Sequence, residues 1–215
     1  MSFWEYLQDR QDLLVFLGFM HLSMVVQCLI LATVIALALA ALVYRNERAV
    51  GIANAVSAAG LTVPSFALLA ILVAGTGFGI TPAVIALTFY AVLPILRNSV
   101  VGLAGVDSAL VDAAQGMGMG RMRILTRVEM PLAWPVILAG VRVSSAMIMG
   151  IAAITAFVQG AGLGGEIFSG LSRLGGANAL NSTLAGTLGI AVLALCLDLA
   201  LRGVGRLTTS RGIRA

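Results

Sequence analysis

One long polar, charge-bearing stretch, residues 106–131, interrupts a sequence that otherwise consists mostly of long apolar runs. Within it, Asp112-Ala113-Ala114 precedes Gly118, and after nine further residues comes Val128-Glu129-Met130-Pro131. Small residues at a bend allow a partner to approach the backbone closely, and nearby methionines offer adaptable apolar contacts. The chemistry that these residue types favour is noncovalent docking.

Intrinsic catalysis is not indicated. The phosphate-binding pattern G-x4-G-K-[ST] does not occur in the sequence, and all thirteen basic residues are arginine. Cys28 and Cys196 lie inside apolar runs without metal-ligand spacing, and the single histidine, His21, is read as a satisfied polar residue. We therefore expect no catalytic residue, no metal and no cofactor bound by this chain.

Composition indicates the elements that must position the polar stretch. The chain is 60% hydrophobic and 10% charged, whereas soluble domains are roughly 45–50% apolar and about 25% charged. A run of about 20 apolar residues crosses a bilayer as a helix. The expected fold class is an all-α, polytopic transmembrane helix bundle of five to six membrane segments. We expect spans near residues 21–43, 51–74, 81–96, 132–158 and 180–201.

Two stretches leave alternatives open. Pro64 falls near the middle of the second span and is expected to split it into two helical pieces, because proline removes a backbone donor. The break is either a kinked packing helix or a broken helix beside a transport path. Residues 159–178 are too rich in glycine for a regular span, and form either an external loop or a short re-entrant element.

Arginine positions predict the orientation. Basic loops face the cytoplasm, and only Arg10 and Arg173 fall outside if the N-terminus is outside and the C-terminus inside. The net charge of +4 is then a matter of topology, and nucleic acid is not an expected partner. The expected organisation is an interfacial segment over 1–18, a transmembrane domain over 19–205 and a cytoplasmic basic tail over 206–215.

The polar stretch is expected to fold as helix, turn and helix on the cytoplasmic side. Asp107 or Ser108 can cap a first short helix by accepting from first-turn amides. A second short helix is expected over 121–129. Met130-Pro131 should end it, because the residue before proline is pushed out of helical geometry.

This spacing resembles the loop E-A-A-x3-G-x9-I-x-L-P of ABC-importer permeases, with Asp112 for Glu, Val128 for Ile and Met130 for Leu. The resemblance implies a MetI-like permease fold in a bacterial inner membrane, whose loop couples to separate ABC ATPase subunits that bind ATP and Mg. It also implies a second permease subunit, identical or different, membrane lipid around the bundle, and a separate periplasmic or lipid-anchored solute-binding protein. The implied ATPase-coupling residues are Asp112, Ala113, Ala114, Gly118, Val128, Met130 and Pro131.

Residues 62–69, 90–98 and 112–120 look more narrowly like the osmoprotectant branch, which imports glycine betaine, choline or carnitine. Aromatic faces attract quaternary ammonium groups, although ordinary packing is the alternative reading of these rings. The expected translocation-path residues are Pro64, Ser65, Phe66, Phe89, Tyr90, Pro94, Asn98 and Phe157. Two other functions stay open: a permease of the same fold for another solute such as an amino acid, and an ATP-independent channel or scaffold.

Overall fold

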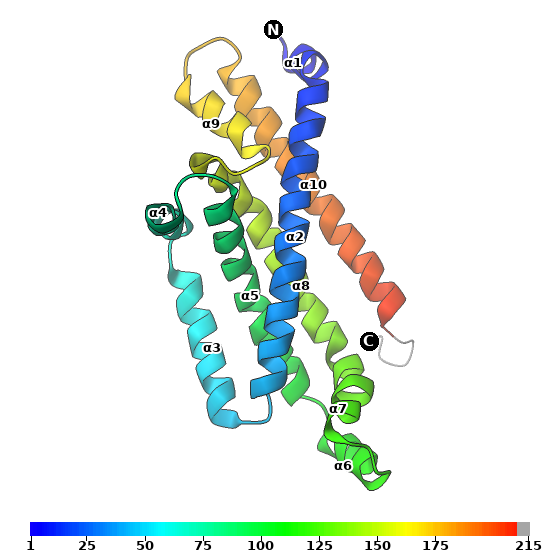
Figure 1. Cartoon of the computed structure of the whole chain (residues 1–215). Helices are drawn as coiled ribbons and strands as arrows, with labels where there is room; N and C mark the ends of the chain where they lie inside the picture. The colour runs from blue at the N-terminus through cyan, green and yellow to red at the C-terminus, as the bar shows by residue number, and fades with distance from the viewer. Residues whose placement is uncertain (210–215) are drawn as a thin grey trace.

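The computed structural model describes residues 1–209, and these form helices without any strand (Figure 1). The predicted all-α fold is confirmed. The elements, in chain order, are α1 (Phe3–Asp9), α2 (Gln11–Val43), α3 (Glu47–Thr62), α4 (Ser65–Thr76), α5 (Ile80–Ala104), α6 (Ser108–Gly116), α7 (Arg121–Ile124), the π-helical η1 (Leu125–Glu129), α8 (Met130–Ile154), the 3-10 helix η2 (Thr155–Val158), α9 (Gly164–Ser172) and α10 (Ala179–Thr208).

Four helical stretches among the described residues are long and apolar enough to cross a membrane: Gln11–Val43, Ile80–Ala104, Arg121–Val158 and Ala179–Thr208. The pair α3 and α4 makes a fifth if it is counted as one span, bent by 91°. The bend lies at Val63 and Pro64, where proline was expected to split the span. The hydroxyl of Tyr90 donates to the carbonyl oxygen of Val63 at 2.6 Å, so α5 satisfies one backbone group freed by the break.

Helix α5 forms the centre of the bundle and packs most extensively against α8 and α2. Small residues make the close approach possible. Gly140 of α8 faces α5, and a Cβ placed on it would lie 2.7 Å from the Cβ of Asn98 and 3.0 Å from the carbonyl oxygen of Pro94. Alanines supply much of the α2 side of the same core, including the fully buried Ala32 and Ala36.

Two boundaries differ from expectation. The first span was expected to begin near residue 21, but α2 runs unbroken from Gln11, so the helix boundary lies at Arg10 and not near residue 18. The expectation that Met130-Pro131 would end the second loop helix is wrong, because η1 continues directly into α8. The assignment of 1–18 to the membrane interface stays a prediction.

The two ends of the bundle carry different elements. α1 and α9 lie at one end, whereas α6, α7 and the turn between α2 and α3 lie at the other (Figure 1). α9 is a short helix within the glycine-rich stretch 159–178, and the choice between an external loop and a re-entrant element there stays a prediction. Of the basic tail expected over 206–215, residues 206–208 belong to α10, and 210–215 lie outside the described residues.

Candidate functional site: a helical knob at one end of the bundle

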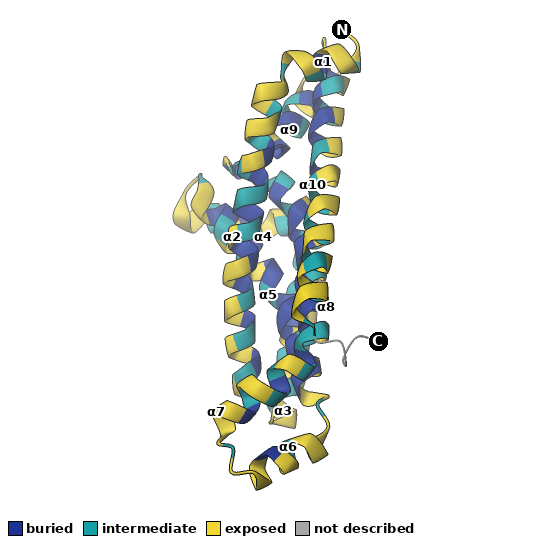
Figure 2. Cartoon of the chain, turned by 90° about the vertical axis from the view of Figure 1, so that its right-hand side faces the viewer, coloured by how far each residue is buried: buried dark blue, intermediate teal, exposed yellow. Residues whose placement is uncertain are grey.

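The polar stretch forms a knob that projects from the end of the bundle (Figure 2). The side chain of Asp107 accepts from the backbone N–H of Ala109 at 2.9 Å and so caps α6, as predicted. A tight turn follows α6, in which the N–H of Met119 donates to the carbonyl oxygen of Ala114 at 3.1 Å. Gly118 adopts a φ of +76° within this turn, a conformation that residues with a Cβ rarely adopt.

The motif residues divide into two sets by exposure. Ala114 is the one buried residue of α6, which packs on η1. Val128 and Met130 are half-buried, and Met130 packs against the core of the bundle. The exposed motif residues are Asp112, Ala113, Gly118 and Pro131. The exposed methionines Met117 and Met122 lie on the same knob.

The second half of the knob is a continuous helix that contains a π-helical segment. In η1 the N–H of Met130 donates to the carbonyl oxygen of Leu125, five residues back. Proline normally clashes with the carbonyl four residues before it. The wider π turn directly ahead of Pro131 moves that carbonyl away, which explains why the proline does not end the helix.

A buried carboxylate anchors this segment to the end of α2. Glu129 is 3% exposed. Its carboxylate accepts from the hydroxyl of Tyr44 at 2.6 Å and from the guanidinium of Arg45 at 3.0 Å. The guanidinium also lies 5.2 Å from the centre of the Tyr44 ring. We call Tyr44, Arg45 and Glu129 the inner knot.

Sequence reasoning missed the inner knot. The loop pattern contains Glu129 only at its variable position, and it predicts no contact with Tyr44 or Arg45. The available signal in the sequence was Glu129, a charged residue between the apolar Val128 and Met130. In the structure, burial raises the pKa of Tyr44, and the hydrogen bond to Glu129 raises it further. The phenol therefore stays a hydrogen-bond donor at neutral pH.

The predicted translocation-path residues do not form one surface. Pro94 and Asn98 pack toward α8, where the side-chain amide of Asn98 donates to the carbonyl oxygen of Pro94 at 2.8 Å. Pro64 and Ser65 lie at the bend, next to the hydroxyl of Tyr90. The structure therefore places the first pair in a helix–helix contact and the second at a break.

Aromatic rings gather on the side of the bundle where α4, η2 and α9 meet. Phe66 and Phe157 have ring centroids 4.6 Å apart, and Phe157 lies 6.4 Å from Phe168. Phe66 is 45% exposed and Phe157 is 51% exposed, so both rings offer a free surface. Phe89 is separate from this group and packs edge-on against Tyr90 at 5.4 Å. Phe168 was not among the predicted residues.

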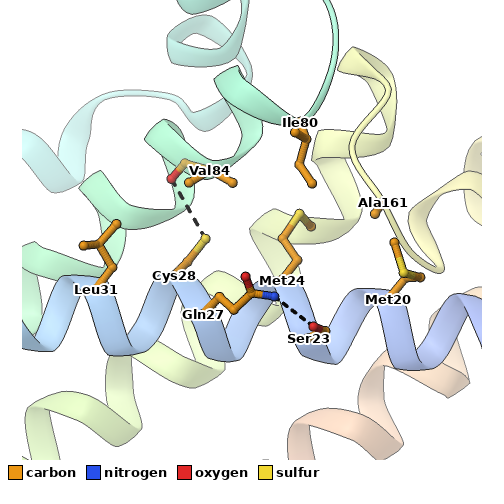
Figure 3. Close-up of a pocket in the computed structure, with 9 residues that line it drawn as sticks. All are labelled: Met20, Ser23, Met24, Gln27, Cys28, Leu31, Ile80, Val84 and Ala161. Atoms are coloured by element: carbon orange, nitrogen blue, oxygen red, sulfur yellow. Dashed lines mark hydrogen bonds between the residues drawn. The ribbon is translucent and has the colours of Figure 1, made fainter.

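A pocket of about 300 Å³ lies elsewhere, between α2 and the start of α5 (Figure 3). Met20, Met24 and Cys28 project into it from successive turns of α2, and Ile80 and Val84 face them from α5. Gln27 and Ser23 provide its polar side and hydrogen-bond to each other at 2.9 Å. None of the predicted path residues lines this pocket.

An ion cluster fixes α10 beside α8. Arg142 donates to Asp198 at 2.8 Å, and Arg202 donates to the other carboxylate oxygen at 2.8 Å. At the C-terminus of α10, the indole N–H of Trp134 donates to the hydroxyl of Thr208 at 2.7 Å. Arg142 is therefore paired within the bundle, which accounts for a charge so far along a span.

Residues 29–209 match the family model of the binding-protein-dependent transport system inner membrane component, and the chain belongs to that family. It is 33% identical to the choline transport system permease protein OpuBB of Bacillus subtilis (strain 168), over 98% of this chain and 95% of that protein. It is 37% identical to the osmoprotectant import permease protein OsmY of Salmonella typhimurium, over 94% and 85% of the two chains.

A carnitine transport permease protein, OpuCD of Listeria monocytogenes, is 38% identical over 86% of this chain and 82% of that protein. The fold also matches a chain of the MetNI methionine ABC transporter in an inward-facing conformation, with a TM-score of 0.80. At 22% identity, over 98% and 100% of the two chains, that likeness concerns the fold alone.

Proposed function

We propose that this chain is the permease subunit of an ATP-driven importer for osmoprotectants of the glycine betaine, choline and carnitine type. The observation that carries the proposal is the knob: its Asp112-Ala113-Ala114, Gly118 and Val128-x-Met130-Pro131 pattern lies on an exposed helix–turn–helix. The names of the relatives, which span nearly the whole chain, support the class of solute.

The knob docks on a separate ATPase. Asp112, Ala113, Gly118 and Pro131 offer its exposed small and polar contacts, and Met117 and Met122 offer adaptable apolar ones. Ala114, Val128 and Met130 hold its two halves together and against the bundle. ATP changes the partner, and the permease responds because the closed ATPase binds one arrangement of the knob better than the other.

The end of the bundle that carries the knob faces the cytoplasm, with the N-terminus outside and the C-terminus inside. Arg45, Arg48 and the three arginines of 121–127 lie at the knob end, whereas Arg10 and Arg173 lie at the other (Figure 1). The outer end then receives solute from a binding protein, and a second permease subunit completes the path.

Phe66 and Phe157 take the quaternary ammonium group at the outer half of the path, and Phe168 completes the aromatic surface. Each ring contributes about 0.5–2 kcal/mol to a cation at its face. Pro64, Ser65 and Tyr90 at the bend lie on the same route, and Phe89, Pro94 and Asn98 support it from α5.

Reconstitution in liposomes with the cognate ATPase and binding protein tests the function. We expect ATP-dependent uptake of glycine betaine, choline or carnitine by the complex. If the complex takes up only an amino acid, the chain is a permease of the same fold for a different solute. Solute flux without ATP or ATPase would overturn the importer and favour a channel.

The same assay tests the aromatic surface. Replacing Phe157 with leucine keeps the apolar volume but removes the ring face, so the KM for a quaternary ammonium solute should rise by about 2- to 30-fold. Phe19→Leu is the matched control, because Phe19 is an exposed ring on α2, away from this surface. Equal KM values for wild type and Phe157→Leu would show that the ring of Phe157 does not bind the solute.

A further inference from the structure

Two buried carboxylates lie at opposite ends of the bundle, and each is held by a tyrosine and an arginine. At one end both donors directly follow α2, whereas at the other the arginine directly precedes α2 and the tyrosine lies in α1. Glu129 belongs to the inner knot described above. At the other end Glu166 of α9, 6% exposed, accepts from the hydroxyl of Tyr6 at 2.7 Å and from Arg10 at 3.1 Å. We call Tyr6, Arg10 and Glu166 the outer knot.

The two knots share their construction as well as their residue types. Arg10 directly precedes α2, and Tyr44 and Arg45 directly follow it. In both knots the guanidinium lies over the tyrosine ring, at 5.4 Å in the outer knot and 5.2 Å in the inner one. In the outer knot Ser182 of α10 adds a third donor, at 2.7 Å from the same oxygen of Glu166.

We propose that α2 is the element that joins the docking knob to the outer end of the permease, with Glu129 and Glu166 as the positioning residues that fasten it at each end. The proposal rests on the function proposed above, in which the knob binds an ATPase. It assigns to α2 a transmitting role in addition to crossing the membrane.

Burial gives the inner fastening its strength. If the knob moved without α2, Glu129 would lose the hydroxyl of Tyr44 and the guanidinium of Arg45 as donors, and removing one partner from a buried charged pair is strongly unfavourable. The end of α2 therefore moves with η1. α2 is one uninterrupted helix of 33 residues, so a displacement at one end is carried to the other.

At the outer end the displacement reaches the proposed path. Glu166 lies in the same short helix as Phe168, whose ring lies 6.4 Å from that of Phe157. The outer knot thus links α2 to the helix that carries part of the aromatic surface. Two fastened ends and one rigid helix form a continuous physical connection between the knob and that surface.

Distance measurements in the reconstituted complex test the inner fastening directly. Spin labels at the exposed positions Leu42 on α2 and Leu110 on the knob, in a background without the two cysteines, report whether these parts move together. We expect the same Leu42–Leu110 distance with and without ATP in the wild type, and a changed or broadened distance with ATP in Glu129→Gln. A wild-type distance that already changes with ATP would overturn the proposal.

Coupling provides the second readout. Glu129→Gln keeps the shape of the side chain and removes its charge, and Tyr44→Phe removes a single hydroxyl. Coupling between sites is typically worth about 5- to 150-fold, so in each variant the ATP hydrolysed per solute imported should rise by about tenfold. Glu166→Gln should have the same effect through the outer knot. Glu47→Gln is the matched control, because it removes an exposed carboxylate near the inner knot.

The outcomes separate the two proposals. If the wild-type complex shows no ATP-driven uptake, the proposed function fails. If the wild type imports solute and the knot variants keep its ratio of ATP to solute, only the transmitting role fails. If uptake and ATP hydrolysis fall in proportion, or if both Glu129→Gln and Tyr44→Phe fail to assemble, the inner knot serves folding. Either result also overturns the transmitting role. If Glu129→Gln uncouples ATP hydrolysis from uptake but Glu166→Gln does not, α2 does not transmit to the outer end, and the proposal is overturned.

Discussion

Gly118 is the residue on which the shape of the knob depends most directly. Its φ of +76° lies in the left-handed region, and a Cβ built there meets no other atom within 4 Å. The constraint is therefore conformational and not a matter of space. Left-handed geometry costs a residue with a Cβ roughly 1–2 kcal/mol.

We expect Gly118→Ala to reduce ATP-driven uptake while the protein still inserts into the membrane. Gly116→Ala adds the same methyl group two positions earlier, also with nothing within 4 Å but without a positive φ, and should transport normally. Uptake and membrane content of the two variants, measured side by side, check this. Normal uptake by both would show that the turn geometry does not matter for coupling.

Local features of single residues could be read from the sequence, and distant pairings could not. The cap by Asp107 and the bend at Pro64 depend on neighbours within a few residues, and both were predicted. Tyr44 and Glu129 are 85 positions apart, and Tyr6 and Glu166 are 160 apart. Such pairs meet only once the helices have packed, so a pattern in one stretch of sequence does not reveal them.

At the scale of elements, the contact between α5 and α8 decides how closely the central helices approach. Gly140→Ala would place a methyl group 3.0 Å from the carbonyl oxygen of Pro94, and overpacking of this kind costs about 1–3 kcal/mol. Gly150→Ala on the same helix meets nothing within 4 Å and should leave stability unchanged or slightly raised. Thermal unfolding in detergent compares them, and equal midpoints would contradict this packing.

The elements themselves were largely predictable, because apolar length marks each span and Pro64 marks the break between α3 and α4. The exceptions have physical causes. α2 begins earlier than its apolar run because Gln11 and Asp12 sit in its first turn, where exposed polar residues are tolerated. The glycine-rich stretch hides α9, since its helix is held by tertiary contacts such as those of Glu166 and not by helix propensity.

At the scale of the whole molecule, the described part of the chain has Arg45, Arg48 and the three arginines of 121–127 in elements at the knob end, whereas Arg10 and Arg173 flank α2 and α9 at the other end (Figure 1). A fluorescent reporter fused to the C-terminus should therefore fold and fluoresce in the cytoplasm, and a reporter that is active only outside the inner membrane should be inactive there. The reverse pattern would invert the bundle and place the knob out of reach of ATP. An N-terminal tag accessible from the periplasm is the complementary control.

The π-helical segment affects the direction in which the proposed docking surface faces. Each residue of an α-helix turns its side chain by about 100° from the previous one, so one additional residue in a turn shifts the phase of everything on its far side by about that angle. The faces of α8 therefore do not extend across η1, and Arg121 to Ile124 point in directions that the periodicity of the span would not give. A deletion of one residue within 125–129 would restore the phase and rotate the knob as a block, turning its methionines away from the proposed ATPase.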